Sequence, residues 1–147
     1  MIRTRLLDRE VGQAMSALSA AAKRGLGDPV LAELVMIRAS QLNHCAFCLD
    51  MHLKAARRNE ESEDRIQLLD AWQETQDLYS ERERAALALT EAVTVLTEGF
   101  VPDAVYENAA KHFEEAELAH LVALIAAING WNRIMVSRRI PPGGYRP

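Results

Sequence analysis

Two cysteines and a histidine lie close together in the segment 45–52, CAFCLDMH. Cys45 and Cys48 are the only cysteines among the 147 residues of the chain. On a helix their Cα atoms would lie about 5 Å apart, within the range that a disulfide accepts. His52 follows Cys48 by four residues, so its imidazole shares a helical face with both thiols. The spacing therefore predicts a reversible dithiol–disulfide pair beside a proton acceptor.

The start of the predicted helix affects the reactivity of these thiols. If the helix begins near His44, both sulfurs lie in its first turn, where unpaired N–H groups and the helix dipole favour the thiolate. His52 could then accept the proton of Cys48 or stabilise the resulting anion. A zinc site is the weaker interpretation, because zinc needs four ligands and only His44 or Glu33 could complete the set.

Glu33 is the carboxylate that could join this site. It lies twelve residues before Cys45, in a segment that is apolar on most sides, and it shares a helical face with Val30 and Ile37. A carboxyl group on an apolar face either finds a partner or has a raised pKa, and both situations are common in functional sites. An ordinary salt bridge is the alternative interpretation.

The remaining sequence predicts an all-α fold, a single domain over residues 1–147 with six to seven helices and a flexible tail at 141–147. No segment alternates convincingly between polar and apolar residues with period two. Asp28 and Pro29 are typical of an N-cap and a first helical residue, and Ser80 with Glu83 is a capping box. The predicted helices cover about 11–25, 29–42, 44–59, 66–72, 80–99, 102–112 and 115–138.

Composition limits the function classes. The chain has 49% hydrophobic and 26% charged residues and a formal net charge of −4, which argues against nucleic acid or an anionic membrane as its main partner. The N-terminus has no signal-peptide pattern, and the most apolar run, 118–131, is too short to span a bilayer. We therefore expect a cytoplasmic protein, in which a Cys-X-X-Cys pair is more often redox-active or metal-binding than structural.

Several segments together resemble the alkylhydroperoxidase D-like branch of the carboxymuconolactone decarboxylase family. They are 33–35 (ELV), 40–43 (SQLN), 45–52 (CAFCLDMH), 80–87 (SERERAAL) and 128–133 (INGWNR). The spacing Glu-x11-Cys-x2-Cys-x3-His is far more specific than Cys-X-X-Cys alone. The resemblance implies an all-helical protein that assembles as trimers or hexamers. It also implies thiol-dependent reduction of hydroperoxides without a metal, flavin or haem.

In that family a proton relay supports the thiol chemistry, and its members match Glu33, Cys45, Cys48 and His52. The resemblance implies that Cys48 attacks the peroxide while His52 takes its proton. Cys45 then closes the disulfide, with Glu33 assisting its deprotonation. An external dithiol of the lipoyl or thioredoxin type would restore the thiols. The best-known members carry a histidine immediately before the second cysteine, whereas this chain carries Phe47, a departure that bears on the rate of turnover.

Other functions stay open at this point. A redox sensor would use the same disulfide to change conformation without turnover, and a general dithiol–disulfide oxidoreductase would act on other proteins. A decarboxylase like the other branch of the family is disfavoured, because those members generally lack the paired cysteines. Trp131 and Asn132 are interpreted as packing and interhelical hydrogen-bonding residues, and His112 and His120 as surface or interface residues.

Overall fold

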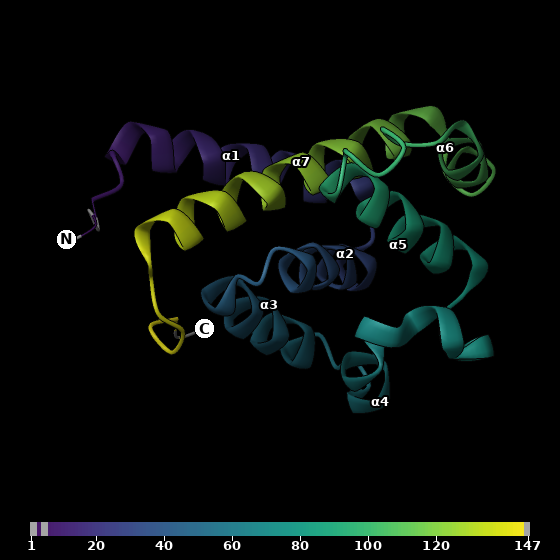
Figure 1. The fold of residues 1–147 in the computed structure, drawn as a ribbon, viewed down its shortest axis with the longest axis horizontal. Coiled ribbons are helices and arrows are strands. Elements are labelled where there is room, and N and C mark those ends of the chain that lie inside the picture. Colours follow the sequence, from purple (N-terminus) through teal and green to yellow (C-terminus); the bar gives the residue numbers. More distant parts are fainter. Residues whose placement is uncertain (1–2, 4–5, 146–147) are drawn as a thin grey trace.

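Helices make up all the regular secondary structure in residues 3 and 6–145, the part of the chain that the computed structural model describes, as the sequence predicted. The arrangement is shown in Figure 1. The α-helices are α1 (Arg9–Leu26), α2 (Pro29–Leu42), α3 (Ala46–Arg58), α4 (Glu63–Gln67), α5 (Glu81–Thr94), α6 (Asp103–Ala110) and α7 (Glu115–Arg138). Two short 3₁₀ helices, η1 (Leu69–Glu74) and η2 (Gln76–Leu78), join α4 to α5.

Helix α2 lies at the centre of the fold, packed against α3, α5 and α7. Its start follows the local signals: the Asp28 carboxylate accepts a hydrogen bond from the N–H of Leu31 at 3.1 Å, and Pro29 is the first helical residue. Every residue from Leu31 to Ser40 is buried, which confirms the prediction of a central helix apolar on most sides. A polar side chain in this helix must therefore find its partner inside the protein.

Helices α1 and α7 come from opposite ends of the chain and lie side by side (Figure 1). The indole N–H of Trp131 on α7 donates to Ser19 Oγ on α1 at 3.1 Å. By length and composition alone α7 could cross a membrane. In this fold it packs against α1, α2 and α5 and buries the polar side chains of Asn129 and Asn132.

Helix α5 is shorter than the sequence predicted. Its capping box forms as expected, but the helix ends at Thr94 and not near Gly99. Gly99 has φ +85°, followed by Phe100 at +50° and Val101 at +58°, so three consecutive residues are left-handed. A left-handed glycine can end a helix, but it can also lie within a connecting turn. The sequence alone did not show which of these two positions Gly99 has.

Residues 141–145, part of the expected flexible tail, lie against α3. The N–H of Gly143 donates to Asp50 Oδ2 at 3.0 Å, and Arg58 donates to the Tyr145 hydroxyl at 2.9 Å. Lys54 pairs with the same Asp50 carboxylate at 2.9 Å. The other two residues of that tail, 146–147, lie outside the described part of the chain.

Candidate active site

Cys45 and Cys48 form a disulfide at the start of α3, with their Cα atoms 5.3 Å apart. Cys48 lies in the first turn of the helix, whereas Cys45 precedes the helix as its N-cap with extended backbone angles. The sulfur of Cys45 accepts a hydrogen bond from the Cys48 backbone N–H at 3.3 Å. The two sulfurs thus have different environments, because only that of Cys45 occupies the capping position.

A tight turn between α2 and α3 places the cysteine pair. His44 adopts a left-handed conformation with φ +54°, and its side chain is exposed. The N–H of Cys45 donates to the Ser40 carbonyl at 3.0 Å, which ties the start of α3 to the end of α2. Histidine is among the residues that tolerate this backbone region best. His44 therefore serves the turn and does not contact the disulfide in the described contacts.

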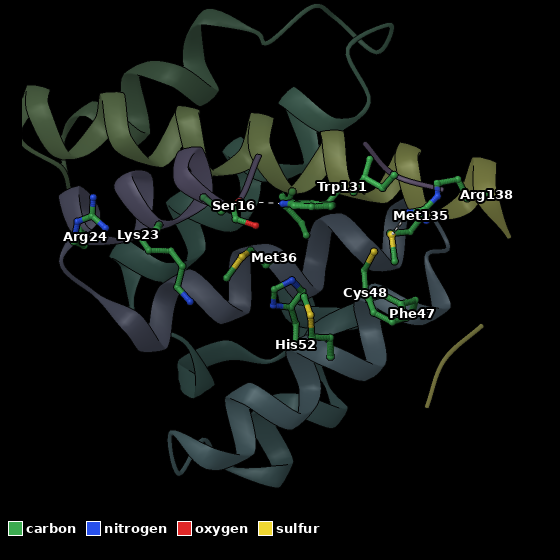
Figure 2. A pocket seen from close by; sticks show the side chains of 15 residues that line it. Ser16, Lys23, Arg24, Met36, Phe47, Cys48, His52, Trp131, Met135 and Arg138 are labelled. Atoms are coloured by element: carbon green, nitrogen blue, oxygen red, sulfur yellow. Dashed lines mark hydrogen bonds between the residues drawn. The ribbon is translucent and has the colours of Figure 1, made fainter. Parts of the chain in front are cut away.

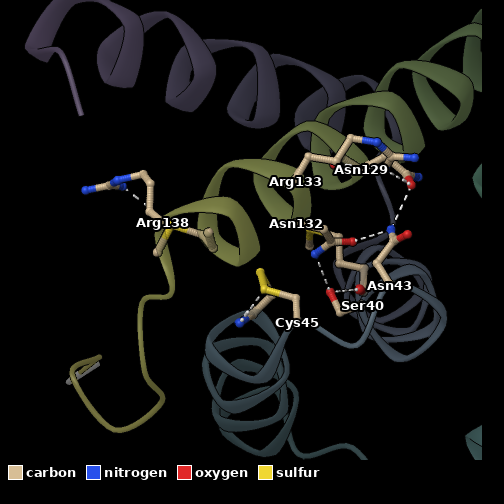
Figure 3. Close-up of a disulfide and its surroundings, with 10 residues drawn as sticks. Ser40, Asn43, Cys45, Asn129, Asn132, Arg133 and Arg138 are labelled. Atoms are coloured by element: carbon tan, nitrogen blue, oxygen red, sulfur yellow. Dashed lines mark hydrogen bonds between the residues drawn. A yellow bond between two sulfur atoms is a disulfide. The ribbon is translucent and has the colours of Figure 1, made fainter. Parts of the chain in front are cut away.

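A network of amides holds the same turn from α7. Asn43 Nδ2 donates to Asn132 Oδ1 at 2.9 Å and to Asn129 Oδ1 at 2.8 Å, and Asn132 Nδ2 donates to Ser40 Oγ at 3.0 Å. Figure 3 shows these side chains beside Cys45. Because buried amides are costly when unpaired, the network fixes α7 relative to the turn. Asn132 thus has the interhelical role that the sequence predicted.

His52 and Glu33 form the second part of the site. His52 Nδ1 lies 2.8 Å from Glu33 Oε2, which joins α3 to α2, and both side chains are buried. Lys23 on α1 donates to the other carboxylate oxygen, Glu33 Oε1, at 3.2 Å. Both oxygens of Glu33 are thus engaged by His52 and Lys23. The sequence-based expectation had Glu33 acting on Cys45, whereas its described contacts lead to His52.

The charge state of Glu33 follows from these neighbours. Burial opposes ionisation of the carboxyl group, but the hydrogen bonds and positive charges of His52 and Lys23 outweigh it and lower the pKa of Glu33 below its ordinary value of 4.5. An ionised carboxylate only accepts hydrogen bonds, so the proton of this contact lies on His52 Nδ1. In the neutral imidazole, Nε2 is then the basic nitrogen.

A cavity of about 700 Å³ lies beside the disulfide, and we call it the Cys48 cavity. Cys48 and His52 both line it, and Cys45 does not. Its walls come from α1, α2, α3 and α7, and Figure 2 shows the side chains that line it. The cavity gives a ligand access to one sulfur of the pair and to the imidazole.

All four residues proposed from the sequence fall in one region of the fold. Cys45 and Cys48 are bonded, His52 lies one turn after Cys48, and Glu33 contacts His52 from α2. Phe47, the residue at which the sequence departs from the family that it resembles, lines the cavity as part of its apolar wall. No group of three or more His, Cys, Asp and Glu side chains in the described residues is arranged to hold a metal ion.

Sequence reasoning missed the contribution of α1 and α7. Lys23 is the third member of the charged cluster, and Trp131 lines the cavity in addition to its packing role. The sequence pattern around Lys23 and Trp131 does not distinguish them from ordinary surface or core residues. The sequence offered one indirect indication of Lys23. Glu33 was expected to be buried, and a buried carboxylate is normally paired with a cation.

The protein matches a known family over most of its helical core. Residues 9–92 fit the model of the carboxymuconolactone decarboxylase family. The chain belongs to this family. It is 47% identical over 105 residues to the uncharacterized protein YdfG of Bacillus subtilis, a match covering 71% of each chain. It is also 37% identical over 123 residues to the uncharacterized protein YnjA of Escherichia coli, covering 83% of this chain and 66% of that protein.

Comparison with solved structures shows that this chain has an alkylhydroperoxidase D-like fold. A crystal structure from Agrobacterium tumefaciens superposes with a TM-score of 0.88 and 36% identity over 94% of both chains. That protein is described as one of unknown function, provisionally assigned as the antioxidant defence protein AhpD. An uncharacterized peroxidase-related protein from Silicibacter shares the fold, with a TM-score of 0.75, 19% identity, and coverage of 93% of this chain and 72% of its own.

Proposed function

We propose that this protein is a thiol-dependent peroxidase that reduces hydroperoxides through a cycle between two thiols and the Cys45–Cys48 disulfide. The observation that carries the proposal is the position of Cys48. Its side chain lines a cavity together with His52, and Cys45 lies within disulfide distance at the start of the same helix. Membership in the carboxymuconolactone decarboxylase family and the alkylhydroperoxidase D-like fold support an antioxidant role.

In the first step Cys48 attacks the peroxide. His52 Nε2 takes the thiol proton. The thiolate sulfur then attacks the terminal oxygen of ROOH, and the O–O bond breaks to give a Cys48 sulfenic acid and an alkoxide. The alkoxide leaves as ROH with the proton that His52 has taken. Cys48 is oxidised by two electrons, and the peroxide is reduced by two electrons.

In the second step Cys45 condenses with the Cys48 sulfenic acid, forming the disulfide and releasing water. An external dithiol of the lipoyl or thioredoxin type then reduces the disulfide by two successive exchanges and leaves as its own disulfide. The cavity exposes the Cys48 sulfur to such an attack, and the leaving thiolate of Cys45 is stabilised by the Cys48 N–H at its capping position. The two environments suit an attacking Cys48 and a leaving Cys45.

Glu33 and Lys23 act through the imidazole in this proposal. The ionised Glu33 holds the Nδ1 proton of His52 and directs Nε2 to the cavity side, and it stabilises the imidazolium that forms when the thiol is deprotonated. Lys23 keeps Glu33 ionised within a buried setting. The pair is thus a positioning device, while Cys48 and His52 are the groups that exchange atoms with the substrate.

The deciding experiment starts from the fully reduced protein. One equivalent of a hydroperoxide is added, free thiols are counted, and peroxide loss is followed after excess dithiothreitol is supplied. A peroxidase consumes many equivalents of peroxide, and Cys48→Ser abolishes the consumption. Oxidation of the two thiols without turnover would favour the redox-sensor alternative, and no loss of thiols would contradict both. Trimeric or hexameric assembly and a cytoplasmic location are further parts of the proposal, testable by sedimentation and fractionation.

A further inference from the structure

The Cys48 cavity is much larger than a peroxide group needs. Its volume of about 700 Å³ exceeds the share of one water molecule in the liquid, about 30 Å³, by roughly twenty-fold. It falls within the range of about 300–1,000 Å³ that is typical of sites for organic ligands. The size alone indicates a substrate with a substantial organic body attached to the reacting oxygen atoms.

The cavity wall is apolar and adaptable over most of its extent. Three methionines, Met36, Met51 and Met135, line it together with Phe47 and Trp131. Methionine side chains are unbranched and polarizable, so they adjust to irregular apolar ligands, and aromatic rings add large apolar surfaces. This lining favours a hydrocarbon body over a sugar or a nucleotide, which would require more hydrogen-bonding partners.

The charged side chains that line the cavity are all basic. Lys23 and Arg24 lie at one end of it and Arg138 lies at the other, with Cys48 between them in the view of Figure 2. No carboxylate is found among the described residues that line the cavity. This local excess of positive charge contrasts with the formal net charge of −4 for the whole chain. The cavity therefore suits an anionic ligand.

Arg24 and Arg138 both lack a carboxylate partner among the described residues, but Arg24 is exposed, whereas Arg138 is half-buried. The Nε of Arg138 is buried and has no hydrogen-bond partner within residues 3 and 6–145, and its Nη1 donates to the sulfur of Met135 at 3.8 Å. A buried charged donor without an acceptor is costly, and such groups are rare in native structures. Lys23, in contrast, is already paired with Glu33. An incoming carboxylate could accept from the two terminal nitrogens of Arg138 as a bidentate pair.

We propose that the substrate is an organic hydroperoxide that carries a carboxylate, and that Arg138 binds this carboxylate while the apolar body lies against the methionines. The proposal rests on the peroxidase function above and specifies its substrate class. Arg138, Met135 and Cys48 follow one another along the cavity (Figure 2), so a head group at Arg138 leaves the rest of the molecule free to extend past the thiol.

The kinetic test compares the hydroperoxide of linoleic acid with that of its methyl ester, which differ only in the charge of the head group. The wild type is expected to have at least a ten-fold higher kcat/KM for the acid. Arg138→Gln should lower kcat/KM for the acid about 10- to 100-fold, mainly through KM, and leave the ester within about two-fold. Equal losses on both substrates, or no preference in the wild type, would overturn the proposal.

Arg139→Gln is the matched control, because it removes the same charge from the next residue, which is exposed and does not line the cavity. It should keep the preference for the acid. If Arg138→Gln does not fold, as judged by its melting curve, Arg138→Lys replaces it, because lysine keeps the charge but loses the bidentate fork. That variant should lose about 3- to 10-fold on the acid only, and an unchanged preference would contradict the proposal.

A binding measurement separates this proposal from the peroxidase function. Octanoate and octan-1-ol are titrated calorimetrically into the oxidised protein, which has no thiol to react. Octanoate should bind at least ten-fold more tightly than octan-1-ol, and Arg138→Gln should abolish the difference. If octanoate binds in this way but no hydroperoxide is reduced, the peroxidase function fails and the carboxylate site stands. If octanoate shows no preference, the site fails whatever the peroxidase assay gives.

Discussion

His52 Nδ1 and Glu33 Oε2 lie 2.8 Å apart, so the imidazole is held between a carboxylate on the central helix and the cavity that Cys48 lines. The contact spans nineteen residues of sequence and joins two helices that pack against one another. It determines which ring nitrogen is free for proton transfer. Predictions about activity and pH dependence follow from this contact and from the different positions of the two cysteines.

The first prediction concerns which cysteine reacts with peroxide. Reduced Cys45→Ser treated with one equivalent of hydroperoxide should accumulate a sulfenic acid on Cys48, because the resolving thiol is absent. Dimedone labelling and peptide mass spectrometry would locate the adduct. The matched variant, Cys48→Ser, should label at least ten-fold more slowly, since Cys45 does not line the cavity. Comparable labelling of Cys45 would reverse the assignment.

The second prediction concerns stability against pH. The pKa of Glu33 is lower in the folded protein than its ordinary value of 4.5, so its ionisation stabilises the fold above about that pH, and the stabilisation is lost as the pH falls through the lower folded value. Glu33→Gln should therefore lower the free energy of unfolding at pH 7 by about 1.5–3 kcal/mol, the contribution of a buried hydrogen bond to a charged group. Urea unfolding of the variant and the wild type measures this difference. The difference should shrink as the pH falls below about 4.5, and a constant difference would contradict the prediction.

The third prediction assigns Lys23 a positioning role. Lys23→Met removes one cation that keeps Glu33 ionised, so the acid limb of the pH profile of kcat/KM should move to higher pH. The shift should be below about one pH unit, because the Lys23 side chain is 41% exposed and its ion pair is screened. One molar salt should reduce it further.

Lys111→Met is the control for this shift. Lys111 is exposed beyond α6 and does not line the cavity, so its removal changes the net charge equally without contacting Glu33. Its pH profile should overlay that of the wild type. If both variants shift equally, the effect comes from overall charge, and the role given to Lys23 is wrong.

The fourth prediction concerns the packing of α1 on α7. Gly25→Ala would place a Cβ 1.9 Å from the His120 ring, so the two helices must separate or the ring must move, at a cost of about 1–3 kcal/mol. Gly12→Ala on the same helix meets only an ordinary contact at 3.4 Å and should stabilise the protein by about 0.5–1 kcal/mol. Urea unfolding of both variants checks the opposite signs, and stabilisation by both would contradict the close approach.

Local signals in the sequence predicted much of this fold. Asp28, Pro29 and the Ser80–Glu83 pair act on backbone groups within one turn of themselves, so their positions define helix starts without knowledge of the rest. The end of α5 was harder to predict, because Gly99 lies in the connection to α6, five residues beyond Thr94, the last residue of the helix. The family resemblance was also available from the sequence, and the match to the family model confirms it.

Spacing along one helix predicted part of the site, and the family resemblance added Glu33 on α2. Cys45, Cys48 and His52 are related by spacing, although Cys45 as the N-cap lies just outside the helix that was expected to contain it. Lys23 reaches Glu33 from α1 and Arg138 reaches the cavity from α7, and no periodicity relates those helices to α3. Contacts of this kind depend on the packing angles of the fold, which local patterns do not encode.

The shared wall of α1 and α7 has a consequence for synthesis of the protein. The cysteines lie in the first third of the given sequence, but one wall of their cavity is α7, which leaves the ribosome after α1, α2 and α3. Until α7 docks, the Cys48 thiol lacks this wall of its cavity, and oxidants reach it with less restriction. Domains whose terminal segments pack together also close late and more slowly, because distant parts of the chain must meet. Selectivity at this thiol is thus acquired only when the nascent chain is complete to the end of α7.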